Sequence, residues 1–157
     1  MPDATLRSIA KLHSRQLKQF ERSTVTYDST YSVATGAVAG TIIYFVTLPT
    51  SARIHGDSFI AWDALGAGTL NLGFAPVDGN FTAAPTALRS GIAVTSASAA
   101  DTRPFLIADH ANNGKLVWEL MGLATDPGGF AELIGTTATA TTSATGDVTV
   151  VVSAHHG

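Results

Sequence analysis

The spacing of apolar and polar residues changes near residue 23. Before that point apolar residues recur at helical intervals. After it they alternate with polar residues in short runs that Gly-, Asn-, Asp- and Pro-containing turns separate. The first pattern is typical of an amphipathic helix, and the second is typical of strands with one buried face. The sequence therefore predicts an N-terminal helical arm, residues 1–22, and a β domain, residues 23–157.

The arm is predicted to be a helix over residues 4–22, because neither Gly nor Pro interrupts a pattern with two unlike faces. At about 100° per residue, one face is apolar and the opposite face is basic. The apolar face holds Leu6, Ile9, Ala10, Leu17 and Phe20, and the basic face holds Arg7, Lys11, Arg15, Lys18 and Arg22. Asp3 or Thr5 is placed to cap the first turn.

The β domain is predicted to contain eight or nine short strands. They cover residues 24–33, 41–48, 59–65, 69–74, 92–96, 105–109, 115–123, 130–141 and 147–154. Residues 82–90 have weak strand character and are expected to form a loop or one helical turn. Short strands at this spacing favour an antiparallel β-sandwich or a barrel. The sandwich, preceded by the basic amphipathic helix, is the fold we expect.

Two segments carry sharper expectations. Residues 41–48 (TIIYFVTL) are apolar on both faces, which predicts a buried central strand. Residues 136–145 contain almost only Thr, Ala and Ser, yet they alternate. We expect them to form a strand that pairs with 147–154, where Val148, Val150 and Val152 share one face.

Charge distinguishes the arm from the rest of the chain. Residues 1–22 carry five basic and two acidic residues, whereas residues 23–157 carry four basic and ten acidic ones. Only 13% of all residues are charged, against about 25% in typical soluble domains. So few charges suggest a surface that is partly buried against other copies, the alternative being an ordinary Thr/Ser-covered β surface. The basic face of the arm suits an attaching element or, alternatively, the solvated side of a docked helix.

Catalytic motifs are absent from the sequence. The glycines at 36 and 40 lack the Lys of a nucleotide-binding loop, and neither a GxSxG elbow nor an HExxH motif occurs. The chain has no Cys, and His55, His110 and the His155–His156 pair have no spacing typical of a metal site. We therefore expect no enzyme, no cofactor and no metal.

The tryptophans Trp62 and Trp118 lie among apolar residues, so core packing is expected for both. Trp62 precedes Asp63, and an aromatic ring beside a carboxylate also suits a sugar-binding platform. Asp57 and Asp63 flank a predicted strand, but nothing in the sequence brings them together.

Residues 42–74 have a recognisable order of motifs. An apolar strand is followed by Leu48-Pro49-Thr50-Ser51-Ala52-Arg53-Ile54, then Asp63-Ala64-Leu65-Gly66, then Gly68-Thr69-Leu70-Asn71-Leu72-Gly73-Phe74. This order resembles a segment of small virion proteins of tailed bacteriophages, in which LP-x-G-A-x-I leads to a strand, a turn and TLxLG. Ser51 stands where the glycine of that pattern falls. The resemblance implies a non-enzymatic β-sandwich or jelly roll, usually homo-oligomeric and often trimeric, that holds the particle with terminal arms.

Together, the residues and the resemblance predict a structural protein located in the virion, most specifically a capsid decoration or accessory head protein. Its expected partners are other copies, with a trimer as the first expectation, and the major capsid protein or another virion protein. No specific nucleic acid and no membrane is expected. The partner-binding residues are predicted to be Leu6, Arg7, Ile9, Lys11, Arg15, Leu17, Lys18, Phe20 and Arg22.

Two other functions stay open at this point. One is a carbohydrate- or receptor-binding β-module of a phage tail or surface structure, which an exposed Trp62 would favour. The other is a small hydrolase, which would need a cleft where two carboxylates converge.

Overall fold

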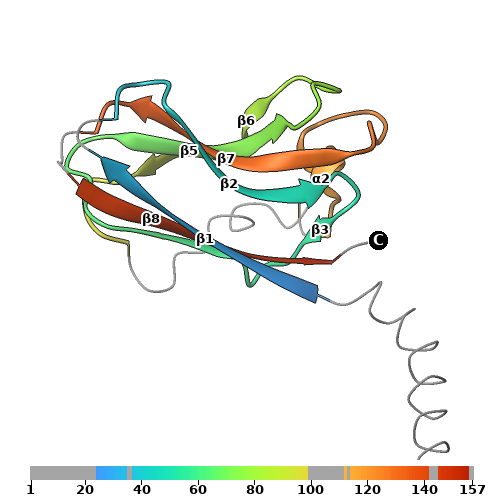
Figure 1. Ribbon diagram of the computed structural model, residues 1–157, viewed down its shortest axis with the longest axis horizontal. Coiled ribbons are helices and arrows are strands. Elements are labelled where there is room, and N and C mark those ends of the chain that lie inside the picture. Colours follow the sequence, from blue (N-terminus) through green and yellow to red (C-terminus); the bar gives the residue numbers. More distant parts are fainter. Residues whose placement is uncertain (1–23, 35–36, 99–111, 113, 142–144, 156–157) are drawn as a thin grey trace, which may run out of the picture.

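The described part of the chain forms two antiparallel sheets (Figure 1). The computed structural model describes residues 24–34, 37–98, 112, 114–141 and 145–155. Sheet A contains β1 (Thr24–Ala34), β8 (Thr145–His155), β3 (Arg53–Ile54) and β4 (Phe59–Trp62); sheet B contains β2 (Ile42–Pro49), β7 (Phe130–Thr139), β5 (Thr69–Pro76) and β6 (Ala84–Ala93). One short helix, α2 (Val117–Leu120), precedes β7. The predicted β character is confirmed for these residues, whereas the predicted arm helix and the strand at 105–109 lie outside them.

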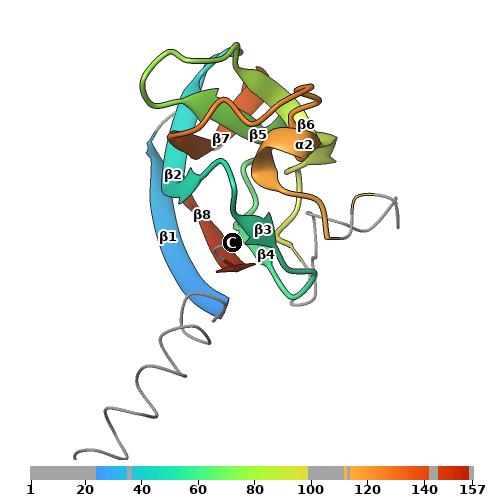
Figure 2. The same cartoon turned by 90° about the vertical axis from the view of Figure 1, so that its right-hand side faces the viewer.

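The strands pair in a nested order. β1 pairs with β8, β2 pairs with β7, and β5 pairs with β6. The strand order is β2-β7-β5-β6 in sheet B, and in sheet A β8 lies between β1 and the two short strands β3 and β4. The sheets stack face to face, with the edge strands β1 and β2 on the same side of the sandwich (Figure 2).

The core lies between the two sheets because each strand presents its apolar positions to the other sheet. From sheet A, β8 contributes Val148, Val150, Val152 and Ala154, all of which are fully buried. The shared face predicted for the three valines is therefore confirmed. Sheet B contributes Ile43, Leu48, Leu70, Leu72, Phe74, Ala131 and Leu133 to the same core.

A side chain fills the gap between β3 and β4. β3 pairs with β8 at residues 154–155 and β4 pairs with it at 148–151, so Ser153 has no strand partner on that side. Instead, Ser153 N donates to Ser58 Oγ at 3.0 Å, and His55 N donates to Ser153 O at 2.8 Å. Ser58 is 1% exposed. The turn between β3 and β4 thus supplies the hydrogen bonds that a continuous strand would have made.

The expectation that residues 41–48 form a central strand is wrong, because β2 is an edge strand of sheet B. Its inward residues Ile43 and Leu48 are buried, as the pattern requires. Its outward residues Ile42 and Tyr44 are apolar as well, and they are 47% and 55% exposed. Because β2 is apolar on both faces, its outward side forms an exposed apolar surface, which no further layer of the described structure covers.

The prediction of a strand at 115–123 is also wrong, since residues Val117–Leu120 form α2. Glu119 stabilises its first turn by accepting a hydrogen bond from Leu116 N at 2.7 Å. Gly122, with φ of 75°, follows the helix. Val117 enters the core, which explains why the apolar run resembled a strand.

One predicted pairing and one predicted loop differ from the structure. The Thr-rich segment does not pair with 147–154: β7 ends at Thr139 and lies in sheet B, whereas β8 lies in sheet A. Residues 82–90, expected to be a loop or a helical turn, contain most of β6. The start of β6 lies so close to β5 that a Cβ on Gly73 would overlap Ala84 O, and the β5–β6 register shifts twice. This irregular pairing conceals the strand pattern in the sequence.

We expect Ser58→Ala to lower the free energy of unfolding by about 1–3 kcal/mol, because it leaves the buried Ser153 N–H without its acceptor. Urea denaturation measures this loss. The control is Ser90→Ala, an exposed serine of β6, which should change stability by less than about 0.5 kcal/mol. Equal effects of the two substitutions would contradict the bridging role of Ser58.

Candidate functional site

The nine predicted partner-binding residues, Leu6 to Arg22, all lie outside the described residues. The structure shows where the first described residue, Thr24, lies. Thr24 starts β1 and pairs with His155, which also pairs with Arg53. Only three residues separate Arg53 from Pro49, the end of β2, and Pro49 pairs with Phe130. Residues 1–23 therefore join the body at the end of the sandwich that carries Phe130.

An apolar surface covers the outward side of sheet B at that end and along β2. We call it the sheet B outer face, and its exposed side chains are Ile42, Tyr44, Val77 and Phe130. Val77 and Phe130 are 46% and 49% exposed and lie side by side, with Val77 N donating to Phe130 O at 3.3 Å. Ile134 pairs with Tyr44, and it is buried although it is not part of the central core. A solvated sheet face normally carries polar residues here.

The charge near this face is acidic. Among β2, β5 and β7, the single charged residue is Glu132, which lies between Thr47 and Ala75. Asp78 follows β5 and Asp126 precedes β7, so both carboxylates lie at the Phe130 end. Within sheet B the basic residue is Arg89 on β6, and Arg53 on β3 of sheet A lies near the Phe130 end. The sheet B outer face therefore combines exposed apolar side chains with a negative border.

The outward side of sheet A has a different character. Thr30 Oγ1 and Thr149 Oγ1 are 2.8 Å apart, and Ser32 Oγ donates to Asp147 Oδ1 at 2.6 Å. These cross-strand pairs satisfy hydroxyl groups of β1 and β8 with each other. Sheet A thus presents a polar face whose hydrogen bonds are largely internal.

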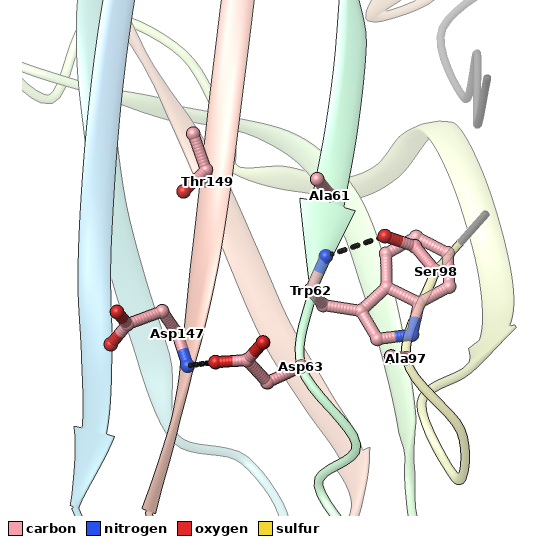
Figure 3. Close-up of a pocket in the computed structure, with 7 residues that line it drawn as sticks. All are labelled: Ala61, Trp62, Asp63, Ala97, Ser98, Asp147 and Thr149. Atoms are coloured by element: carbon pink, nitrogen blue, oxygen red, sulfur yellow. Dashed lines mark hydrogen bonds between the residues drawn. The ribbon is translucent and has the colours of Figure 1, made fainter. Parts of the chain in front are cut away.

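A hollow of about 380 Å³ lies at one edge of this polar face (Figure 3). It is lined by Ala61, Trp62, Asp63, Ala97, Ser98, Asp147 and Thr149. Asp63 Oδ2 accepts from Asp147 N at 2.9 Å, while the Asp147 carboxylate points the other way, toward Ser32 on β1 (Figure 3). The two carboxylates therefore border one hollow without converging on a common point, and the arrangement gives no acid–base pair.

Trp62 is partly buried and packs against the core. Its indole N–H donates to Ser96 O at 2.9 Å, and its backbone N donates to Ser98 Oγ at 2.9 Å. The expected core packing of Trp62 is thus met in part, and its polar end is engaged within the chain. Asp147, from the distant end of the sequence, is a lining residue that sequence reasoning missed, because only the β4–β8 pairing brings it beside Asp63.

The other candidate residues do not gather into a site. Asp57 and Asp63 lie at opposite ends of β4, so the pair considered from the sequence does not form. The His55 and His155 rings meet edge to face at 6.2 Å between centroids. Within the described ranges, no three His, Cys, Asp or Glu side chains are grouped as metal ligands. Searching the same residues for a helix long and apolar enough to cross a membrane finds none.

Comparison with known proteins identifies a shared fold. A chain of the cyanophage Pam1 capsid asymmetric unit superposes with a TM-score of 0.52 at 20% sequence identity. The match covers 87% of this chain and 86% of that chain, so it extends over nearly the whole of both. No protein-family model and no curated protein matches the sequence. The likeness establishes that the two chains have the same fold.

We expect Trp62→Ala to lower the free energy of unfolding by about 2 kcal/mol or more, since it removes packing of a large side chain against the core. Trp62→Phe should cost roughly 1 kcal/mol, because it keeps most of that packing and loses the bond to Ser96 O. Urea denaturation separates the two. An unchanged stability in Trp62→Ala would show that the ring is not needed for packing and would favour a ligand platform.

Proposed function

We propose that this chain is a non-enzymatic structural protein of a bacteriophage virion. The observation that carries the proposal is the extended likeness of its fold to a chain of a cyanophage capsid asymmetric unit. The motifs at 42–74, which resemble small virion proteins of tailed phages, support it independently of the fold. The proposed location is the virion, and the proposed partners are other virion proteins and further copies of this chain.

More specifically, we propose a capsid decoration or accessory head protein with a jelly-roll-like body. The nested pairing of β1 with β8 and β2 with β7 around the β5–β6 hairpin supports the jelly-roll assignment. The exposed sheet B outer face supports association with protein, because apolar patches that stay open on soluble proteins commonly mark interfaces. A homotrimer is the proposed assembly because the virion proteins that residues 42–74 resemble are often trimeric, and several copies that bind together gain avidity.

The arm, residues 1–22, is the proposed anchor. We expect the body to fold without it, because the described residues of the two sheets already pack into a core cluster. Its predicted apolar face offers Leu6, Ile9, Leu17 and Phe20, each worth about 1.5–3 kcal/mol if fully buried. Its exposed basic residues should contribute less, roughly 0.2–1 kcal/mol each, and their contribution should weaken with salt.

A carbohydrate-binding module is the second candidate, favoured by the hollow beside Trp62 with its carboxylate and hydroxyl groups. Trp62 offers only part of its ring, because the indole packs on the core and its N–H is bonded to Ser96. Binding of glycans by the wild-type chain that Asp63→Ala abolishes, without loss of stability, would favour this candidate over the structural role.

We expect Leu17→Ala combined with Phe20→Ala to release the protein from its particle more effectively than Lys11→Ala combined with Arg15→Ala. The apolar side chains supply most of the binding energy under this proposal. Co-sedimentation of the variants with particles at low and high salt measures the difference. A greater loss in the charge variant would instead support an electrostatic anchor, including one on nucleic acid or a membrane.

The role as a whole is tested by imaging particles with and without this protein. We expect regularly spaced density on the head that disappears with the protein. Unchanged heads, with the protein found only in the soluble fraction, would contradict a virion role.

A further inference from the structure

We propose that the sheet B outer face of one copy binds the N-terminal arm, residues 4–22, of a second copy. The inference rests on the proposed function in one respect, the assignment of the arm as the attaching element, and it names the surface that the arm occupies. The partner is therefore another molecule of this chain, and the contact links copies in a head-to-tail manner.

The apolar surfaces of the arm and the face match in kind and in length. On the face, Ile42 and Tyr44 lie on β2, Phe130 lies beside Pro49 at the end of β2, and Val77 lies one strand further away, after β5. All four are 46–55% exposed. From Ile42 to Pro49, the partner of Phe130, β2 spans about 23 Å at the usual strand rise. The apolar face of the predicted helix runs from Leu6 to Phe20, about 21 Å at 1.5 Å per residue. One arm can therefore cover the exposed apolar side chains along the whole strand.

The charges of the two surfaces are also complementary. Glu132 lies on the face, and Asp78 and Asp126 border it at the Phe130 end. The arm carries five basic residues on the side opposite its apolar stripe. With the apolar stripe against the sheet, the long Arg and Lys side chains can extend around the helix toward these carboxylates.

Chain connectivity favours a second copy over the same chain. The predicted helix ends at residue 22 and β1 starts at Thr24 in sheet A, so one intervening residue must make any turn. Two residue steps span at most about 7 Å. The sheets of a sandwich lie about 10 Å apart, and the outer face of sheet B lies beyond that distance. The C-terminal end of the helix must therefore stay near Thr24, so the helix of the same chain cannot lie along β2 on this face unless part of the helix or of β1 unfolds.

Such a contact uses different surfaces on the two copies. Each molecule offers one arm and one face, so the contacts form a ring if the rotation closes and an open chain if it does not. A closed ring of three is the arrangement that agrees with the proposed trimer. The same contact on neighbouring particle sites would also link copies on a lattice.

Light scattering of full-length variants provides the first test. We expect the wild-type chain to be an oligomer at tens of micromolar. Both the face variant, Ile42→Thr with Tyr44→Ser, and the arm variant, Leu17→Ala with Phe20→Ala, should weaken self-association by at least about tenfold. The matched control is Tyr31→Ser, which removes a tyrosine of β1 that is 44% exposed and lies in the other sheet. It should stay oligomeric.

Disulfide trapping provides the second test. Because the chain has no cysteine, only the introduced cysteines can form disulfides. Chains carrying Tyr44→Cys are mixed with tagged chains carrying Phe20→Cys or Leu17→Cys and are oxidised mildly. We expect disulfide-linked pairs of one chain of each kind to exceed pairs of identical chains. With Tyr31→Cys in place of Tyr44→Cys, this excess should disappear.

Three outcomes would overturn the inference: a face variant that is as oligomeric as the control, an unchanged chain that is strictly monomeric, or cross-linking that does not depend on the position in the body. None of them removes the proposed virion role. That role fails separately, if the protein is not found on particles. An arm variant that leaves particles while the face variant stays oligomeric and bound would retain the anchor and reject this face as its receiver.

Discussion

Sheet A depends on a single strand, because every other strand in it is hydrogen-bonded to β8. β8 pairs with β1 along its whole length on one side and with β3 and β4 on the other. Its inward side chains, three valines and an alanine, are fully buried against sheet B. β8 is therefore constrained in two ways. Its apolar residues must alternate with polar ones to fill the core, and its backbone needs hydrogen-bonding partners on both edges. Ser58 is buried because it meets the second requirement where the strands leave a gap.

The alternation of apolar and polar residues and the positions of turn residues were sufficient to predict the features that depend on neighbours in the sequence. Alternation predicted the inward valines of β8, and turn residues predicted breaks such as the one at Gly79, whose φ is 70°. Pattern failed where the outcome depends on distant partners. Residues 41–48 have the composition of a central strand, but strand order places β2 at an edge. Residues 115–123 have an apolar run that suits a strand, but Glu119 and Gly122 cap a short helix.

The candidate sites were predictable to different degrees. The basic and apolar faces of the arm stay a prediction from residue spacing, whereas the sheet B outer face could not be predicted in this way. The sheet B outer face contains Tyr44, Val77 and Phe130, which are far apart in sequence and share one face only through the pairing of β2, β7 and β5. The hollow likewise joins Asp63 to Asp147 across 84 positions. Periodicity identifies that a residue points outward, but only strand order identifies its neighbours.

The two outer faces of the sandwich differ in chemistry: sheet A presents hydroxyl groups that are hydrogen-bonded to each other, and sheet B presents exposed apolar side chains. On sheet A, hydroxyl groups bond to each other across β1 and β8, so exposure to water costs this face little. On sheet B, Ile42, Tyr44 and Phe130 remain about half exposed, and burying them against a partner recovers free energy in proportion to the apolar area covered. A body with one satisfied face and one unsatisfied face has a preferred orientation on any assembly. In the proposed assembly, sheet B would face protein and sheet A would face solvent, which agrees with the low content of charged residues.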